Sequence, residues 1–484
     1  MTRVLYTRCR DAILAGFLFS ATVGCLEAAT PNVLVLLVDD LGWKDLSCTG
    51  SDFYETPNID ALAKSGVLFS QAYAASPVCS PTRASLLTGQ YPARIGHTHI
   101  VQAYGRWPAS SPLTEPDWVP VLPLEAVTLA EMLKPAGYTT AHIGKWHLGG
   151  RADQPRTPEA DPLNQGFDLN IGGTMEGQPP DYFFPYERTL KSAGKTLRLG
   201  KLPPGKLGDY LTEVLTDSAL DFLDVQAGQK LPFFLEVNFF TVHTSTGDRL
   251  QARADKIAKY QEKAAGMPPG DQRNPVYAAM VEHLDEAVGR IVQRLDKLGM
   301  RENTILFLLS DNGGHGGKTS MRPLRGAKSS AYEGGIRVPA LVSWPGRVPA
   351  GTVSDTPVHS IDLFPTVLDL LGIAASDEPI DGVSLKALLL NSPDLDLNRP
   401  LFWHNPHYYP HAAPHSAVRY GDYRLIEFLE EGRLELYNLQ EDPGEQVNLA
   451  DREPGKRIEL QQMLDRWRTD VGAPMPGRKQ KEEE

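Results

Sequence analysis

Cysteine is scarce in this chain of 484 residues, which contains only four. Two of them, Cys9 and Cys25, fall in an apolar segment at the N-terminus, so only Cys48 and Cys79 remain for the rest of the protein. Two thiols exclude a fold that depends on a disulfide framework. They could pair with each other, be buried as small apolar side chains, or be used chemically, and composition alone favours burial for both.

Positive charge is also in short supply. The chain has 48 lysines and arginines against 60 aspartates and glutamates, a formal net charge of -12. A broad phosphate-binding surface is therefore not expected, and nucleic acid is not an expected partner. Any anionic ligand has to be held by a local cluster of cations. The length and the 41% hydrophobic content predict a globular protein with two or three cores, which excludes disorder and collagen.

Long apolar runs are absent beyond the N-terminus. There, arginines precede the run AILAGFLFSATVGCLEAA (12–29), which is too short for a membrane helix and predicts an export signal over residues 1–29. Cleavage is expected near Ala28 or Ala29, and the protein is expected in the periplasm or outside the cell. The sequence TVGC, ending at Cys25, keeps open a lipid-anchored form, the only one that would touch a membrane.

Four apolar, β-rich runs organise the rest of the chain. They cover residues 32–40, 138–147, 232–243 and 303–312, and they lack the alternation of a half-exposed strand. Such runs are typical of parallel strands covered on both faces. Helical patterns lie between them, most clearly over 275–298, where apolar residues follow one helix face. The sequence therefore predicts an α/β fold with a mainly parallel central sheet.

Each of these runs ends in polar or ionisable residues. They are Asp39, Asp40, Lys145, His147, His243, Asp311 and Asn312. One such residue is usually a turn or cap, but seven at equivalent strand ends indicate a functional site, because loops converge there in parallel sheets. The carboxylate and amide oxygens suit a hard cation, Ca²⁺ or Mg²⁺, and not zinc.

The segment VCSPTRASLLTG (78–89) adds a thiol to this set. If a helix begins there, Cys79 lies at its positive end and Arg83 follows on the same face. Sulfur is a poor ligand for a hard cation, so something is expected to replace it. Together with Arg83, residues Lys145 and Lys328 and the two histidines would supply a positive field, which suggests a tetrahedral anionic substrate group.

CSPTR followed by ASLLTG resembles the sulfatase signature Cys-x-Pro-x-Arg extended by Leu-Thr-Gly. VLLVDDLGWKDLSCTG, TPNIDALAKSGVLF, GYTTAHIGKWHLG, LLSDNGGHG, RGAKSSAYEGGIRVPALVSWPG and YRLIEFLEEGRLELYNLQEDPGEQVNLA resemble further family segments in order and spacing. The resemblance spans residues 31–460. The chain is identified as a member of the formylglycine-dependent sulfatases of the alkaline phosphatase superfamily, similar to arylsulfatase A and N-acetylgalactosamine-6-sulfatase.

The resemblance implies an alkaline-phosphatase-like domain and a site built on formylglycine, which a maturation enzyme makes from Cys79. It implies a Ca²⁺ ion, in preference to Mg²⁺, bound by Asp39, Asp40, Asp311, Asn312 and the oxygen of modified Cys79. It also implies that the formylglycine hydrate attacks sulfur. The catalytic residues carried over are Cys79, Arg83, Lys145, His147, His243 and Lys328. No counterpart gives Cys48 a catalytic role, so burial is expected for it.

The domain boundaries are predicted from composition. Residues 30–385 are expected to form the catalytic domain. Residues 386–475 are expected to form a smaller α+β domain with an antiparallel sheet and a helix over 456–471. The remaining residues, 476–484, are predicted to be a solvated tail.

The segment WHNPHYYPHAAPH (403–415) concentrates histidines and aromatic residues where the smaller domain begins. A zinc site, an exposed loop without function and a substrate rim are the three interpretations. The rim hypothesis assigns sugar binding to His404, His407 and Tyr408. It predicts removal of sulfate from the end of a sulfated saccharide.

Two alternatives to a sulfatase remain at this stage. The chain could hydrolyse phosphonates or phosphate monoesters with the same nucleophile, or it could be an unmatured, noncatalytic protein that binds sulfated glycans. The simultaneous presence of Cys79, Arg83 and the cationic residues favours an enzyme, because folding alone does not require that set.

Overall fold

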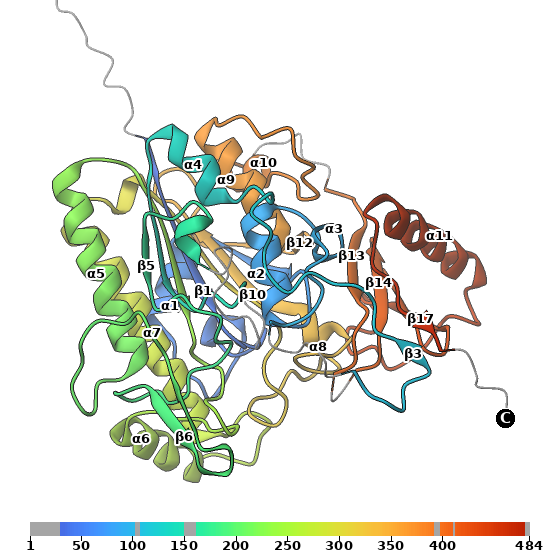
Figure 1. The fold of residues 1–484 in the computed structure, drawn as a ribbon, viewed down its shortest axis with the longest axis horizontal. Helices are drawn as coiled ribbons and strands as arrows, with labels where there is room; N and C mark the ends of the chain where they lie inside the picture. Colours follow the sequence, from blue (N-terminus) through green and yellow to red (C-terminus); the bar gives the residue numbers. More distant parts are fainter. Residues whose placement is uncertain (1–29, 102–106, 150–160, 392–396, 410–411, 480–484) are drawn as a thin grey trace, which may run out of the picture.

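A mainly parallel sheet of nine strands forms the centre of the protein (Figure 1). The computed structural model describes residues 30–101, 107–149, 161–391, 397–409 and 412–479. The predicted export signal and Cys25 lie outside these residues. The consecutive parallel neighbours are β9 (Thr304–Ser310), β1 (Asn32–Val38), β8 (Phe233–Phe239), β4 (Thr139–Gly144) and β5 (Leu169–Ile171). The four strands predicted from apolar runs are thus confirmed and lie side by side.

The other half of the sheet departs from this parallel order. Strand β10 (Arg337–Ser343) runs antiparallel between β9 and β2 (Val67–Tyr73). Two short strands, β11 (Thr352–Ser354) and β12 (Val358–His359), then pair with β2 in parallel. The sheet is therefore mixed. Its parallel half contains the four strands that were predicted to end in polar residues.

Helices cover both faces of the sheet and create two cores. Alternate residues of β1 divide between them: Leu34, Leu36 and Val38 face one core, and Val33, Val35 and Leu37 face the other. The first core includes α1 (Pro57–Lys64), α5 (Leu211–Gln229) and α7 (Pro275–Lys297), and the second includes α2 (Cys79–Thr88), α4 (Leu129–Leu133) and α9 (Leu363–Leu371). Full burial of each such side chain contributes about 1.5 to 3 kcal/mol, which explains the apolar character of both faces.

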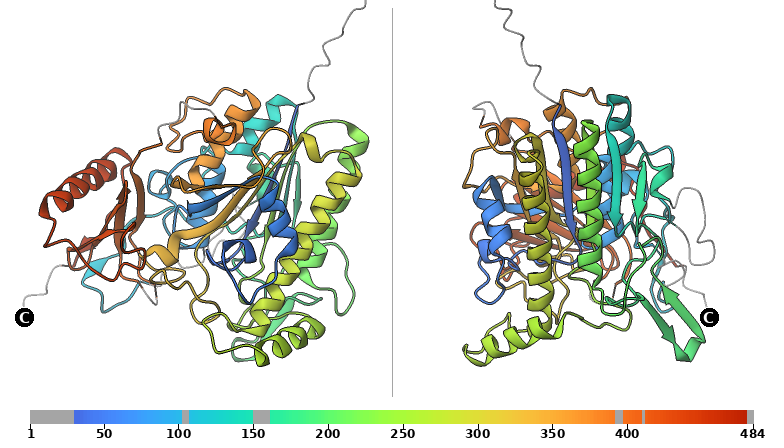
Figure 2. Two further views of the ribbon diagram at one scale, coloured as in Figure 1. Left: turned by 180° about the vertical axis from the view of Figure 1, so that it is seen from behind. Right: turned by 90° about the vertical axis from the view of Figure 1, so that its left-hand side faces the viewer.

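A second, four-stranded sheet forms the smaller domain at one end of the molecule (Figure 2). Its antiparallel strands are β13 (Leu401–Asn405), β14 (His415–Tyr420), β15 (Tyr423–Phe428) and β16 (Arg433–Asn438). Helix α11 (Pro454–Asp470) packs against the sheet through Leu460 and Leu464. The Trp403 indole donates to the Ala74 carbonyl over 2.8 Å, which joins this domain to the larger one.

Short elements complete the fold. They are α3 (Pro92–Ile95), α6 (Ala254–Ala265), α8 (Glu333–Ile336), α10 (Lys386–Leu389), β3 (Leu113–Thr114), β6 (Glu187–Leu190), β7 (Lys195–Arg198) and β17 (Gly477–Arg478). Strand β17 pairs with β3 and lies within the segment predicted to be a solvated tail, where both of its residues are exposed. Of the helices in the described part of the chain, none combines the length and the apolar character needed to cross a membrane.

Candidate active site

The carboxyl ends of β1 and β9 bring four oxygen-bearing side chains together. Asp39 and Asp40 follow β1, and Asp311 and Asn312 follow β9. The two strands are parallel neighbours, with Val38 opposite Ser310, so the residues after them leave the same edge of the sheet. All four side chains are fully buried. The structure thus assembles the predicted metal-ligand residues of the two strands.

Hydrogen bonds inside this cluster leave two oxygen atoms unpaired. The Asn312 amide donates to Asp40 Oδ1 over 2.7 Å, and the Asp40 backbone N–H donates to Asp311 Oδ1 over 3.3 Å. Asp40 Oδ2 and Asn312 Oδ1 have no hydrogen-bond partner among the described residues. A buried acceptor without a partner costs about 1 to 3 kcal/mol, so this donor set fits a hard cation that would use both oxygens.

Cys79 is the first residue of α2 and lies against the acidic cluster. Val78 before it is extended, and the helix ends at Gly89, whose φ of 69° allows the chain to turn away. The Cys79 side chain is buried, and Sγ lies 3.6 Å from Asp39 Oδ1. One ligand atom each from Asp39, Asp40, Cys79 and His243 lies within 4.8 Å of the others. The residue predicted to become the nucleophile is therefore part of the candidate metal site.

An unmodified Cys79 would contribute little chemistry in this environment. Burial raises the pKa of its thiol to about 12, although the Lys145 and Lys328 charges act in the opposite direction. The thiol would therefore remain protonated at neutral pH, and the thiolate is the form that acts as nucleophile and metal ligand.

Two buried cations are paired with the acidic cluster. Arg83 donates from Nε and Nη2 to Asp311 Oδ2, over 2.9 and 2.7 Å, and from Nη1 to the Lys145 carbonyl over 2.8 Å. Lys145 Nζ donates to Asp39 Oδ2 over 2.7 Å. Burial raises the pKa of Asp39 to about 7 despite the Lys145 charge. Loss of one partner from such a pair would strand a buried charge, which costs about 3 to 5 kcal/mol.

Lys328 and His243 approach Asp40 from the loops after β9 and β8. Lys328 Nζ lies 2.6 Å from Asp40 Oδ1, and His243 Nε2 lies 3.6 Å from Asp40 Oδ2. Burial lowers the pKa of His243 to about 3, although Asp40 opposes this shift. His243 Nδ1 lies 2.7 Å from the Thr244 carbonyl, so in the neutral ring Nδ1 donates and Nε2 is an acceptor. Two acceptors then face each other, an arrangement that a cation between them would stabilise.

His147 follows β4 and presents a neutral imidazole. Its φ is 58°, its side chain is buried, and its Nδ1 has no hydrogen-bond partner among the described residues. Burial lowers its pKa well below the usual value, and Lys145 and Arg83 add to the effect. A methyl group at Gly177 would lie 2.4 Å from the His147 ring, so only glycine lets the chain pass this closely. The ring is thus an unprotonated base held between a strand end and a close backbone.

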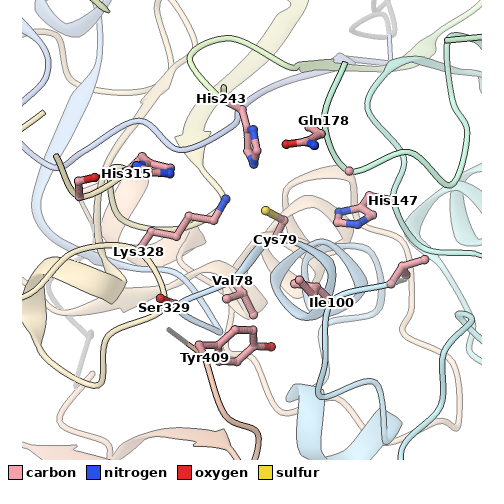
Figure 3. Close-up of a pocket in the computed structure, with 13 residues that line it drawn as sticks. Val78, Cys79, Ile100, His147, Gln178, His243, His315, Lys328, Ser329 and Tyr409 are labelled. Carbon is pink, nitrogen blue, oxygen red and sulfur yellow. Dashed lines mark hydrogen bonds between the residues drawn. The ribbon is translucent and has the colours of Figure 1, made fainter. Parts of the chain in front are cut away.

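A cavity of about 350 Å³ opens above Cys79. Cys79, His147, His243 and Lys328 all line it and converge on one point, as Figure 3 shows. Arg83, Lys145 and the acidic residues are buried and are not among the residues that line it. The structure thus brings together the six predicted catalytic residues and the predicted metal ligands.

The lining residues that the sequence did not single out include Gln178, His315 and Tyr409. His315 stands three residues after Asn312, within the same motif, and that adjacency was an available signal. Gln178 follows Gly177 in a segment without any pattern that suggests function. Tyr409 adjoins a residue that was selected, and only the fold decides which of the two faces the cavity.

None of the three residues predicted for the substrate rim lines the cavity. His404 is buried in β13, with Nδ1 2.8 Å from Ser416 Oγ and Nε2 2.9 Å from the Pro474 carbonyl. His407 is fully buried beside Thr98, and Tyr408 donates to Glu430. The segment enters a sheet and packs against the larger domain, and His407 Nδ1 and both polar side-chain atoms of Asn405 are buried there without a hydrogen-bond partner among the described residues.

The geometry also weighs against a zinc site here. Ligand atoms of His99, Glu115 and His407 lie within 4.8 Å of one another. However, the His99 and His407 rings stack with centroids 4.1 Å apart and planes 20° from parallel. An imidazole binds a metal in its ring plane, and two nearly parallel planes do not meet at one ion.

Cys48 is half-buried and, like Cys79, is a free cysteine, so the predicted burial of Cys48 is only partial.

Comparison with known proteins identifies the family. The sulfatase family model matches residues 31–373, and the model of the N-sulphoglucosamine sulphohydrolase C-terminal region matches residues 327–470. A sulfatase of Formosa agariphila is 32% identical over 92% of this chain and 90% of its own length. The mouse N-acetylgalactosamine-6-sulfatase is 34% identical over 79% of this chain and 71% of its own. The chain belongs to the sulfatase family and is a sulfuric ester hydrolase.

Solved structures support the same fold. The structure of Ps i-CgsB in complex with k-i-k-neocarrahexaose superposes with a TM-score of 0.75 at 29% identity. It covers 90% of this chain and 92% of its own. The alkaline-phosphatase-like α/β architecture expected from the sequence is thereby confirmed.

Proposed function

We propose that this protein is an exported sulfatase that removes sulfate from carbohydrates, with formylglycine made from Cys79 as its nucleophile and Ca²⁺ as its metal. The observation that carries the proposal is the position of Cys79. It lies at the start of a buried helix, 3.6 Å from Asp39, at the floor of a cavity lined by His147, His243 and Lys328. The apolar segment at residues 12–29 supports export.

The buried oxygens identify the residues that would hold the cation. Asp39, Asp40, Asp311 and Asn312 supply oxygen only, and one oxygen each of Asp40 and Asn312 lacks a partner among the described residues. The family resemblance favours Ca²⁺ over Mg²⁺. When bound, such an ion supplies positive charge that lowers the pKa of a neighbouring hydroxyl group.

Residue 79 would supply the reacting oxygens after its oxidation. A formylglycine hydrate carries one hydroxyl group that can attack sulfur and a second whose deprotonation can expel sulfate, a covalent route that divides one difficult displacement into two steps. The neutral thiol in the same position offers neither group.

The surrounding side chains have separate tasks in this proposal. Arg83 orients Asp311, which takes the proton of the attacking hydroxyl group. Lys328 and His243 hold the sulfate and help to protonate the leaving alcohol, a role that requires His243 to gain a proton at Nε2 when the sulfate binds. His147 has a lowered pKa and an unpaired Nδ1, so it is suited to remove a proton from the second hydroxyl group, with Lys145 beside it.

A saccharide is the proposed source of the ester. The relatives include enzymes named N-acetylgalactosamine-6-sulfatase, and Ps i-CgsB has been solved with a bound neocarrahexaose. A cavity of about 350 Å³ lies at the lower end of the range for small ligands, which fits one sugar ring better than a passing chain. We therefore propose action at the end of a chain.

Peptide mass spectrometry and substrate comparison together test the proposal. In active protein, the peptide covering residues 75–91 should carry formylglycine at position 79. Wild-type protein should hydrolyse p-nitrophenyl sulfate faster than p-nitrophenyl phosphate, and it should release sulfate from sulfated monosaccharides. An active protein whose Cys79 is fully alkylatable would contradict the nucleophile assignment.

The same assay separates the alternative functions. Faster turnover of p-nitrophenyl phosphate would indicate a phosphate monoesterase. Binding of sulfated saccharides without turnover of either ester, by protein that retains the cysteine, would indicate a noncatalytic binding protein.

A further inference from the structure

The cavity above Cys79 has two chemically different walls. His147, His243 and Lys328 form a polar wall, with Gln178 and His315 beside them. The remaining side chains that matter here are apolar or aromatic: Val78, Ile100, Val101 and Tyr409. Figure 3 shows Tyr409 and His243 on opposite sides of Cys79. A sulfate held at the polar wall would therefore leave its alcohol portion near the aromatic side.

Tyr409 is a contribution of the smaller domain to this cavity. Among the described residues that line it, Tyr409 is the only one that follows β13. Its backbone N–H donates to the Ala412 carbonyl over 3.0 Å, and the Ala412 N–H donates back to the Tyr409 carbonyl over 3.2 Å. This pair of bonds fixes the main chain on which the ring is mounted.

A hydrogen bond also fixes the far end of the ring. Tyr409 Oη lies 2.7 Å from His99 Nδ1, and the Ile100 backbone N–H donates to the same nitrogen over 2.9 Å. In the tautomer in which Nδ1 accepts from Ile100, this nitrogen carries no proton and the Tyr409 hydroxyl group donates to it. Burial raises the pKa of Tyr409 well above its usual value, so the hydroxyl group keeps that proton.

His99 is itself held by its neighbours. Its ring stacks on His407 at 4.1 Å between centroids and lies 5.2 Å from the Trp118 ring. His407 Nε2 is 2.9 Å from Thr98 Oγ1. His407 therefore supports the cavity wall from behind. Because His99 in turn holds the Tyr409 hydroxyl group, the Tyr409 ring loses little conformational freedom when a ligand packs on it.

We infer that Tyr409 is the platform on which the sulfated sugar packs, with the C–H face of the sugar against the aromatic ring, and that His99 is a positioning residue for that ring. The inference rests on the proposed carbohydrate substrate and adds the residue that selects it. The sulfate end is fixed at Cys79, so the sugar ring attached to it has to lie along the wall where Tyr409 is mounted. Aromatic rings favour such contacts through their apolar faces.

Binding measured without turnover tests the inference. In a Cys79→Ala background, isothermal titration with a sulfated monosaccharide that the wild type hydrolyses gives the reference Kd. Adding Tyr409→Ala should weaken binding about tenfold, the size expected for loss of one aromatic contact. Adding Tyr409→Phe keeps the ring and loses its bond to His99, so about two- to threefold weaker binding is expected. His99→Gln should resemble Tyr409→Phe.

Tyr408→Phe is the matched control, because Tyr408 does not line the cavity, and it should leave Kd unchanged. In the active enzyme, Tyr409→Ala should act mainly on KM and little on kcat, a division that general loss of structure would not produce. Unchanged Kd in Tyr409→Ala protein that melts like the parent would overturn the platform, as would equal weakening by Tyr408→Phe. A wild type that turns over p-nitrophenyl sulfate and no sulfated saccharide would instead overturn the proposed substrate class.

Discussion

Two regions of this protein gather histidines and other polar residues, and only one of them forms the candidate active site. At the carboxyl ends of β1, β4, β8 and β9, residues distant in the sequence meet within hydrogen-bonding distance. Around β13, His404, His407 and Tyr408 are close in sequence and make separate contacts inside the protein. Parallel strands deliver all their carboxyl ends to one edge. The position of a polar residue at the end of a parallel strand therefore indicated the candidate active site, whereas a local concentration of histidines and tyrosines did not.

Replacement of Cys79 should produce the largest loss of activity. If it did not, the distinction between the two polar regions would fail. Cys79→Ala removes the proposed nucleophile, so kcat/KM for p-nitrophenyl sulfate should fall by about 10⁴-fold or more. The melting temperature should stay close to that of the parent, because the change is small and the acidic cluster keeps its cations. Cys48→Ala is the matched control and should retain activity, since Cys48 does not line the cavity. Substantial turnover by Cys79→Ala would refute the site.

Removal of the metal should have the second-largest effect on activity. Extensive chelation should abolish turnover and lower the melting temperature, since binding at 1,000 times Kd stabilises a protein by about 4 kcal/mol. Added Ca²⁺ should restore both properties better than Mg²⁺. Elemental analysis checks that the chelated protein is metal-free. Full activity in such protein would show that the oxygen cluster after β1 and β9 does not serve a cation.

Gly177→Ala tests the position of the His147 ring in the candidate active site, and its effect on activity should be smaller than that of metal removal. The added methyl group would lie 2.4 Å from the His147 ring and displace it, and misplacement by about 1 Å can cost on the order of 10²-fold in rate. We expect kcat to fall about 10- to 100-fold. Gly200→Ala is the matched control, because a methyl group there meets nothing within 4 Å. Equal kinetics in the two variants would argue against a precise role for His147.

His404→Ala should have the smallest effect on activity and tests the second region. It removes the bonds to Ser416 and Pro474, so the free energy of unfolding should fall by about 1 to 3 kcal/mol. The value of kcat/KM for a sulfated saccharide should stay unchanged. Denaturant unfolding and initial-rate assays measure the two quantities. A selective loss of saccharide turnover would restore the rim hypothesis for this residue.

Much of the fold was predictable because burial leaves a clear record in the sequence. Strands covered on both faces appear as unbroken apolar runs, and α7 carries an apolar stripe, so their places could be predicted. The direction of β10 could not, because a strand covered on both faces has the same apolar pattern whichever way it runs. Which of Tyr408 and Tyr409 lines the cavity could not be predicted either. It depends on the backbone bridge at Tyr409 and on contacts with residues near His99, about 310 positions away in the sequence.

The burial of Cys79 also constrains when the proposed oxidation to formylglycine could take place. The residue is 2% exposed in the folded chain, so an oxidising enzyme would have to reach it before the fold closes. The central strand β1 pairs with β9, whose Thr304 lies opposite Asn32, so the sheet cannot be completed until that part of the chain has been made. At common rates of synthesis, the interval between Cys79 and the end of β9 is roughly 10 to 50 seconds. The long separation in sequence between neighbouring strands would thus leave an unfolded Cys79 segment available for the proposed oxidation during synthesis, and the order of assembly would become part of how the active site is made.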